Sequence, residues 1–125
     1  MNSTRFEHWF DQYCRAFENE DADGVGALFA EECVYCWGPF NEPRYGRKAV
    51  ARHHAGAVEH QKQLKFTFEM LGTTETVGVC RFWLTLLRTD NNTRVKYDGI
   101  FKVTLDEANQ CSLFEEWYHW QETPA

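Results

Sequence analysis

The chain has 125 residues and a formal charge of −6, with 43% hydrophobic and 16% aromatic residues. This length and composition predict one globular domain over residues 1–125 with a core of its own. The acidic balance, without any run of Lys or Arg longer than two, argues against nucleic acid and anionic membranes as partners. No apolar stretch approaches a membrane span, and the start MNSTRFEHWF lacks a signal-peptide pattern, so we expect a cytoplasmic protein.

The five cysteines are scattered through apolar surroundings. Cys33-x-x-Cys36 has the spacing of a redox or metal motif, but the segment reads as a strand, where a spacing of three places the two thiols on opposite faces. No second pair is present. We therefore expect reduced, mostly buried thiols and no metal site.

Helical periodicity predicts three helices in the first half of the chain. The first begins at a capping box, Thr4-x-x-Glu7, and runs to about Asn19 with an aromatic stripe. Asp21 is placed to cap a short second helix. Gly46 precedes a third helix, which the pattern extends over residues 47–61.

Strand signals dominate the second half. A short strand is expected at residues 34–37, followed by a Pro-containing loop, and alternating strands at residues 64–70 and 77–89. Asp90-Asn91-Asn92 is a turn signal, because Asn and Asp tolerate positive φ. Residues 93–120 form a long hairpin with its turn at 106–109. Helices gathered on one face of an antiparallel meander predict an α+β fold whose twisted strands enclose a cone-shaped hollow.

Four segments carry a resemblance to a known superfamily. They are EDADGVGALFAEECVY (20–35), YGR (45–47), DGIF (98–101) and FEEWYH (114–119). In this order they resemble the nuclear transport factor 2-like superfamily, with its ketosteroid isomerase-like and SnoaL-like members. The resemblance implies a cystatin-like α+β roll, in which a curved antiparallel or mixed sheet wraps around three N-terminal helices. It implies no single activity, because the superfamily includes isomerases, cyclases, dehydratases, epoxide hydrolases and non-catalytic association domains.

The ketosteroid isomerase pattern matches this chain only in part. Its oxyanion-donating tyrosine falls on Tyr13, but its proton-abstracting carboxylate falls on Trp37 and its second oxyanion donor, an acid, falls on Phe101. Both departures remove groups that the isomerase needs. The resemblance therefore does not extend to that reaction.

The same comparison places one carboxyl, one imidazole and one phenol in the hollow: Glu116, His54 and Tyr13. A Glu among aromatic rings has its charged form disfavoured, which suits a general acid or base. The alternatives are a one-residue bulge that turns Glu115 inward or both glutamates outward, and an ion pair of Glu116 with Arg81 or Arg88. For His54 and Tyr13 the alternative is that they are satisfied core residues. His53 and His54 are adjacent, so we expect only one to face inward. The aromatic walls are expected to include Trp37, Phe82, Tyr97, Phe101, Phe114 and Tyr118.

The opposite face of the sheet is expected to carry an apolar patch, formed by Trp83, Leu87, Ile100, Leu113 and Trp117. Such a patch is typical of a protein interface, and we expect a homodimer through it. Strand alternation places Asp98 on this outer face too, paired with Lys96, Arg81 or a partner chain.

Two kinds of function fit these expectations. In the first, the domain is a cofactor-independent acid/base enzyme of the isomerase, cyclase, dehydratase or hydrolase type, acting on a small apolar or aromatic molecule. In the second, it is a non-catalytic dimeric ligand-binding or association domain.

Overall fold

The protein, described here from a computed structural model, is defined over residues 2–125. Its elements are α1 (Asn2–Glu18), α2 (Ala22–Gly26), β1 (Phe29–Cys36), β2 (Arg44–Tyr45), α3 (Arg47–Val58), β3 (Gln61–Thr73), β4 (Val77–Arg88), β5 (Thr93–Leu105) and β6 (Cys111–Pro124).

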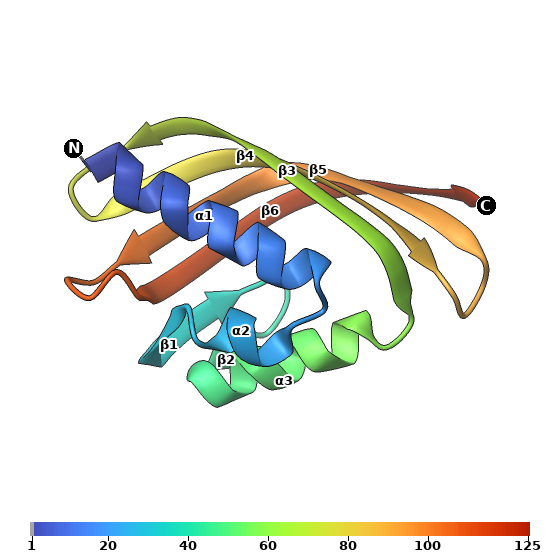
Figure 1. Ribbon diagram of the computed structural model, residues 1–125, viewed down its shortest axis with the longest axis horizontal. Coiled ribbons are helices and arrows are strands. Elements are labelled where there is room, and N and C mark those ends of the chain that lie inside the picture. The colour runs from blue at the N-terminus through green and yellow to red at the C-terminus, as the bar shows by residue number, and fades with distance from the viewer. Residues whose placement is uncertain (1) are drawn as a thin grey trace.

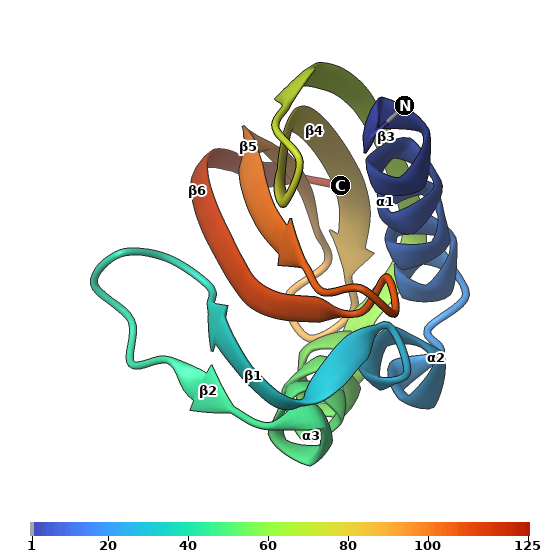
Figure 2. The same cartoon turned by 90° about the vertical axis from the view of Figure 1, so that its left-hand side faces the viewer.

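The six strands form one mixed sheet in the order β2-β1-β6-β5-β4-β3. Strands β1 and β6 pair in parallel, and the other neighbouring strands pair antiparallel. The long strands curve, and α1 lies along their concave side (Figure 1). Helices α2 and α3 lie at the β1–β2 end of the sheet (Figure 2). The predicted α+β fold, a curved sheet around three helices, is confirmed.

The helices form where the periodicity places them, but two of their boundaries differ. Helix α1 already includes Asn2, so Thr4 lies inside the helix and the predicted capping box is wrong. The first turn is held by tertiary contacts instead, because Arg5 donates to the backbone oxygens of Glu75 and Asp106. Helix α3 ends at Val58 rather than near residue 61, where β3 begins.

Two short segments position α2 and α3 as predicted. The Asp21 carboxylate accepts a hydrogen bond from the Gly24 N–H at 2.9 Å and caps α2. Gly46 precedes α3 with φ of +90°, a conformation that side chains with a Cβ rarely adopt. Its N–H donates to the Cys33 carbonyl at 2.9 Å, which ties the start of α3 to β1.

The strands follow the predicted alternation closely in β4 and β5. In β1 the strand begins at Phe29, five residues earlier than the pattern indicates, because Phe29 pairs with Cys111 of β6 across an irregular register. The two-residue strand β2 was not predicted; it pairs with β1 inside the expected loop. The turn at 90–92 has Asn92 at φ of +52°, as its sequence indicates.

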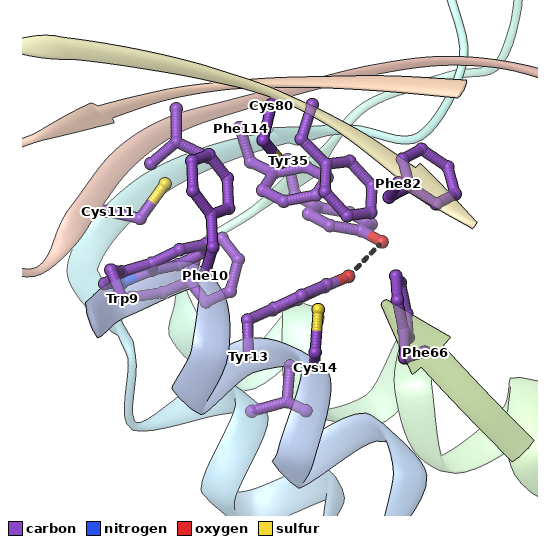
Figure 3. Close-up of a cluster of buried hydrophobic side chains, with 14 of the residues drawn as sticks. Trp9, Phe10, Tyr13, Cys14, Tyr35, Phe66, Cys80, Phe82, Cys111 and Phe114 are labelled. Atoms are coloured by element: carbon purple, nitrogen blue, oxygen red, sulfur yellow. Dashed lines mark hydrogen bonds between the residues drawn. The ribbon is translucent and has the colours of Figure 1, made fainter. Parts of the chain in front are cut away.

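The core lies between α1 and the concave face of the sheet (Figure 3). Alternate residues of β4, β5 and β6 point to it and are buried, among them Cys80, Phe101 and Phe114. The ring of Phe82 stacks on that of Phe101 with centroids 3.9 Å apart. Gly99 allows this arrangement, because a Cβ there would lie 2.8 Å from the Phe82 ring.

Candidate active site

A cavity of about 340 Å³ opens where α1 ends, between the sheet and α3. Its edge strand β3 is held to α1 at Phe66, whose N–H donates to the Glu18 carboxylate and whose carbonyl accepts from Arg15, both at 2.6 Å. The walls are largely aromatic. The lining residues are Tyr13, Phe17, Tyr35, Trp37, His53, His54, Ala57, Gln61, Phe66, Phe82, Leu84, Leu86, Tyr97, Phe101, Glu116 and Tyr118.

The structure brings together the three residues proposed for chemistry, Glu116, His54 and Tyr13, and five of the six expected wall residues. The exception is Phe114, which is 0% exposed and does not line the cavity. Its ring stacks on that of Tyr35 at 4.8 Å and is covered by Trp9 and Tyr13 of α1. Phe114 is therefore a core residue, because α1 still covers the sheet at this position.

Glu116 lies on β6, opposite Phe101 of β5, and its half-buried side chain borders the cavity. Among the residues that the structure describes, none forms a hydrogen bond or ion pair with its carboxyl group. Burial raises the pKa of Glu116 to about 8. At pH 7 the group is therefore predominantly a neutral carboxylic acid, able to donate a proton.

Neither the bulge nor the ion pair expected as an alternative for Glu116 occurs among the described residues, because Glu116 lines the cavity. Glu115 points to the other face, with its carboxylate 3.8 Å from the ammonium of Lys102. Arg81 pairs with Asp98, and Arg88 pairs with Asp90. The two arginines are thus engaged with other acids on the surface of the protein.

Tyr13 and His54 form a hydrogen-bonded pair at the floor of the cavity. The Tyr13 hydroxyl lies 3.1 Å from Nε2 of His54, and the other ring nitrogen, Nδ1, lies 3.1 Å from the carbonyl of Val50. His54 is 2% exposed, and burial lowers its pKa to about 4. Burial also raises the pKa of Tyr13 well above its ordinary value. Both groups are therefore neutral over the physiological pH range.

The expectation that only one of the adjacent histidines faces inward is wrong. His53 also lines the cavity, nearer its rim, where its ring lies 4.7 Å from that of Trp37. Adjacent residues project only about 100° apart on a helix, so two neighbours on α3 can both border one cavity. Burial, and then the nearby Arg44, lower the pKa of His53.

Two polar lining residues were missed by the sequence analysis, Tyr35 and Gln61. Tyr35 is buried on β1, and its hydroxyl lies 3.5 Å from that of Tyr13 (Figure 3). Tyr35 is two residues before Trp37, so both side chains point to the same face of the strand. Because Trp37 was expected in the cavity wall, this alternation could have predicted Tyr35 there as well. Gln61 was expected at a helix end; in the structure its buried Oε1 has no partner among the described residues.

The cysteines are all unpaired thiols. Cys33 is buried and Cys36 half-buried on opposite faces of β1. Over residues 2–125, no three His, Cys, Asp or Glu side chains gather as a metal ion would require.

The outer face of the sheet carries the five residues of the expected patch. Trp117 is the most exposed of them, at 42%, and the others are half-buried. The Arg81 guanidinium lies over the Trp83 ring at 4.8 Å and donates two hydrogen bonds to Asp98, at 2.9 and 2.7 Å. Asp98 is thus part of this surface and has no place in the cavity.

Comparison with protein families matches residues 10–109 to the SnoaL-like domain, so the chain belongs to the SnoaL-like family. Among solved structures, the fold is similar to an LEH-like epoxide hydrolase of M. tuberculosis, with a TM-score of 0.77 and 16% identity over 93% of this chain and 84% of that one. It is also similar to SalBIII, an epoxide hydrolase/cyclase-like enzyme in pyran ring formation in the polyether salinomycin, with a TM-score of 0.80 and 16% identity over 94% and 92%.

Identities this low establish the shared fold alone. No curated protein matches the sequence significantly. None of the described helices is long and apolar enough to cross a membrane.

Proposed function

We propose that the protein is a cofactor-independent acid/base enzyme that acts on a small, uncharged, apolar or aromatic molecule containing an oxygen atom. The observation that carries this proposal is Glu116, a carboxyl group in an aromatic-walled cavity that has no polar partner among the residues the structure describes. A cavity of about 340 Å³ is within the usual range for small-molecule sites.

The charge of the lining supports an uncharged substrate. None of the lining residues that the structure describes is Lys or Arg, so an anion would enter without a compensating charge. Both lining histidines have lowered pKa values and are neutral near pH 7. The aromatic walls supply apolar contacts instead.

In the proposed reaction Glu116 is the group that transfers protons. Its neutral acid donates a proton to the substrate oxygen as a carbon–oxygen bond breaks or a carbonyl is polarised. The carboxylate that remains then takes a proton from the attacking water, hydroxyl or adjacent carbon, which restores the acid. Isomerisation, cyclisation, dehydration and hydrolysis all follow this proton balance. We assign positioning roles to His54 and Tyr13, because each is engaged by the other.

The test is turnover of a panel of small neutral compounds by wild type and Glu116→Gln. The two similar structures motivate epoxides such as styrene oxide as the first members, with aromatic ketones next. Glu116→Gln is expected to lower kcat/KM by about 10²–10⁴-fold. The matched control is Glu115→Gln, a change of the same kind on the outer face of the same strand, and it is expected to retain activity.

The pH profile provides a second readout of the same proposal. Since the proposed acid must be protonated, kcat/KM is expected to fall as the pH rises through about 8. Unchanged turnover in Glu116→Gln, with the fold intact, would remove this residue from the mechanism.

A second candidate is ligand binding without turnover. It is favoured by the mutual hydrogen bond of Tyr13 and His54, which satisfies both groups as in an ordinary core. This candidate predicts that panel compounds raise the melting temperature without being converted, and that Glu116→Gln changes affinity alone.

We also propose that two copies pair through the outer sheet face. The apolar Trp83, Ile100 and Trp117 lie beside charges of both signs, so a two-fold axis can bring opposite charges together. Trp117→Glu is expected to give monomers in sedimentation experiments. The control is Trp120→Glu, on the opposite face of β6 and 57% exposed, which is expected to leave the dimer intact. Free thiols fit a reducing compartment, and we propose the cytoplasm.

A further inference from the structure

The hydrogen bonds at the cavity floor have a direction that begins at the Val50 carbonyl. This oxygen can only accept, and Nδ1 of His54 lies 3.1 Å from it. Nδ1 must therefore carry the ring proton. In a helix the Val50 carbonyl is four residues before His54, so the ring is held by its own helix in this tautomer.

The direction then passes to Tyr13. A neutral imidazole has one N–H, so Nε2 of His54 is a bare acceptor facing the Tyr13 hydroxyl at 3.1 Å. The lowered pKa of His54, caused by its burial, keeps the ring in this neutral form. Tyr13 must donate its only proton to Nε2. Toward the cavity, its oxygen is left as an acceptor.

The Tyr35 hydroxyl lies next to that of Tyr13 in this series of hydrogen bonds. Its proton is the one that remains available for a ligand. The Tyr13 and Tyr35 oxygens are 3.5 Å apart, at the outer limit of a hydrogen bond, and no other partner of the Tyr35 hydroxyl occurs among the described residues. The ring itself is fixed, since it stacks on Phe114 at 4.8 Å and meets Phe29 edge-on at 5.8 Å. Within the side chain, only the hydroxyl hydrogen can change its position, by rotation about the C–O bond.

We infer that Tyr35, and not Tyr13, donates the hydrogen bond to the oxygen of the cavity ligand, because the only hydroxyl proton of Tyr13 is committed to His54. This inference rests on the proposed function, in that the ligand carries an oxygen. It also specifies the ligand oxygen: Tyr35 and the neutral Glu116 are both donors, so the ligand must carry an oxygen that can accept, such as that of a ketone, ether or epoxide.

The first test needs neither ligand nor variant. In ¹⁵N-labelled protein at pH 7, long-range ¹H–¹⁵N spectra distinguish a protonated ring nitrogen from a bare one. We expect His54 to carry its proton on Nδ1, with Nε2 bare. A proton on Nε2 would make His54 the donor and free the Tyr13 proton for the cavity, which would overturn the inference even if Glu116→Gln abolishes turnover.

The second test measures the donor directly, with acetophenone as a neutral probe. Hydrogen bonding lowers the frequency of its carbonyl stretch, so wild type is expected to show a lowered band for the bound ketone. Tyr35→Phe is expected to move that band back toward its position in hexane, and Tyr13→Phe to leave it lowered. The control is Tyr45→Phe, whose ring is 67% exposed outside the cavity.

The opposite ranking of the two variants, or a band in wild type at its hexane position, would contradict the inference. Each Tyr→Phe change keeps the ring and its packing, so melting temperatures near that of wild type check that the fold is retained. The outcome is separate from that for the proposed function, because the band reports a hydrogen bond in the absence of turnover.

Discussion

The concave face of the sheet is packed with side chains at one end and holds a cavity at the other, although the same strands form both ends. At one end α1 covers the strands and inward residues such as Phe114 are wholly buried. At the other end, where α1 finishes at Glu18, the cavity lies between the sheet and α3. Glu116 lies at this second end, on the same face of β6 as Phe114 and two residues after it.

This contrast shows what strand alternation decides and what it leaves open. Alternation determines which face a side chain occupies. Whether the face is packed or hollow depends on how far the covering helix extends. A carboxyl two residues from a fully buried phenylalanine is tolerated because its neighbours leave space around it, and because it holds a proton there.

Phe114→Ala is the change expected to affect stability most. Removing a fully buried ring under α1 leaves a space that the core cannot fill, so we expect a loss of about 3–5 kcal/mol in the free energy of unfolding. Trp37→Ala, at the half-buried rim of the cavity, is expected to cost about 1–2 kcal/mol. Urea denaturation of both variants measures the difference; equal losses would mean that the two ends are packed alike.

Stability as a function of pH is expected to report the proton that Glu116 holds in the cavity. The folded state holds this proton up to about pH 8, whereas the unfolded chain releases it near 4.5. Between these values the folded state binds more protons, so stability falls as the pH rises and stays reduced above pH 8. Glu116→Gln lacks this proton and does not lose stability in the same way. Between pH 4.5 and pH 9, its free energy of unfolding is therefore expected to rise by roughly 2–4 kcal/mol relative to that of wild type.

The pKa of His54 is shifted in the opposite direction, to about 4. The stability that its neutral ring contributes is therefore lost as the pH falls from about 6.5 to 4. Both proteins retain His54, so their comparison cancels that effect. A constant difference between wild type and Glu116→Gln from pH 4.5 to 9 would show that this carboxyl titrates as in water.

The charge of a ligand is expected to have a smaller effect, on binding affinity. This effect distinguishes binding inside the cavity from binding to an exposed apolar surface. At pH 7, benzoate is expected to bind at least about tenfold more weakly than benzyl alcohol, because none of the described lining residues is a Lys or Arg that could offset the lost hydration. Calorimetry at matched concentrations makes the comparison. Equal affinities would place both ligands outside the cavity.

Asp98→Asn is expected to have the smallest effect. Its ion pair with Arg81 is on the exposed outer face, where such pairs contribute little, so stability and turnover are expected to remain within error of wild type. Melting curves and the styrene oxide assay check this. A large loss of turnover would shift attention from Glu116 to Asp98.

Sequence reasoning recovered the parts of the fold that depend on periodicity. Alternation in β4 and β5 assigned Phe82, Phe101 and Asp98 to the faces they occupy. It failed where tertiary contacts decide: α1 extends past Thr4 because Arg5 holds it, and β1 starts at Phe29 because β6 pairs with it. Neither contact is visible in a local pattern.

The lining of the cavity could be predicted only in part for the same reason. Glu116 was found because a charged residue interrupts an aromatic face. Phe114 was misplaced, since the sequence does not tell where α1 stops covering the sheet. His53 was not expected beside His54, because the two residues are adjacent in the sequence and only one was expected to face inward. Tyr35 was passed over although it lies on the same strand face as Trp37.

The most direct test of the account is the titration of Glu116 itself, followed through its carboxyl carbon by ¹³C NMR in the ligand-free protein. We expect a midpoint near pH 8 for this resonance, which is assigned by its absence in Glu116→Gln. A midpoint near the ordinary value of about 4.5 would mean that the carboxyl is ionised at neutral pH, and the proposed proton donor would not exist.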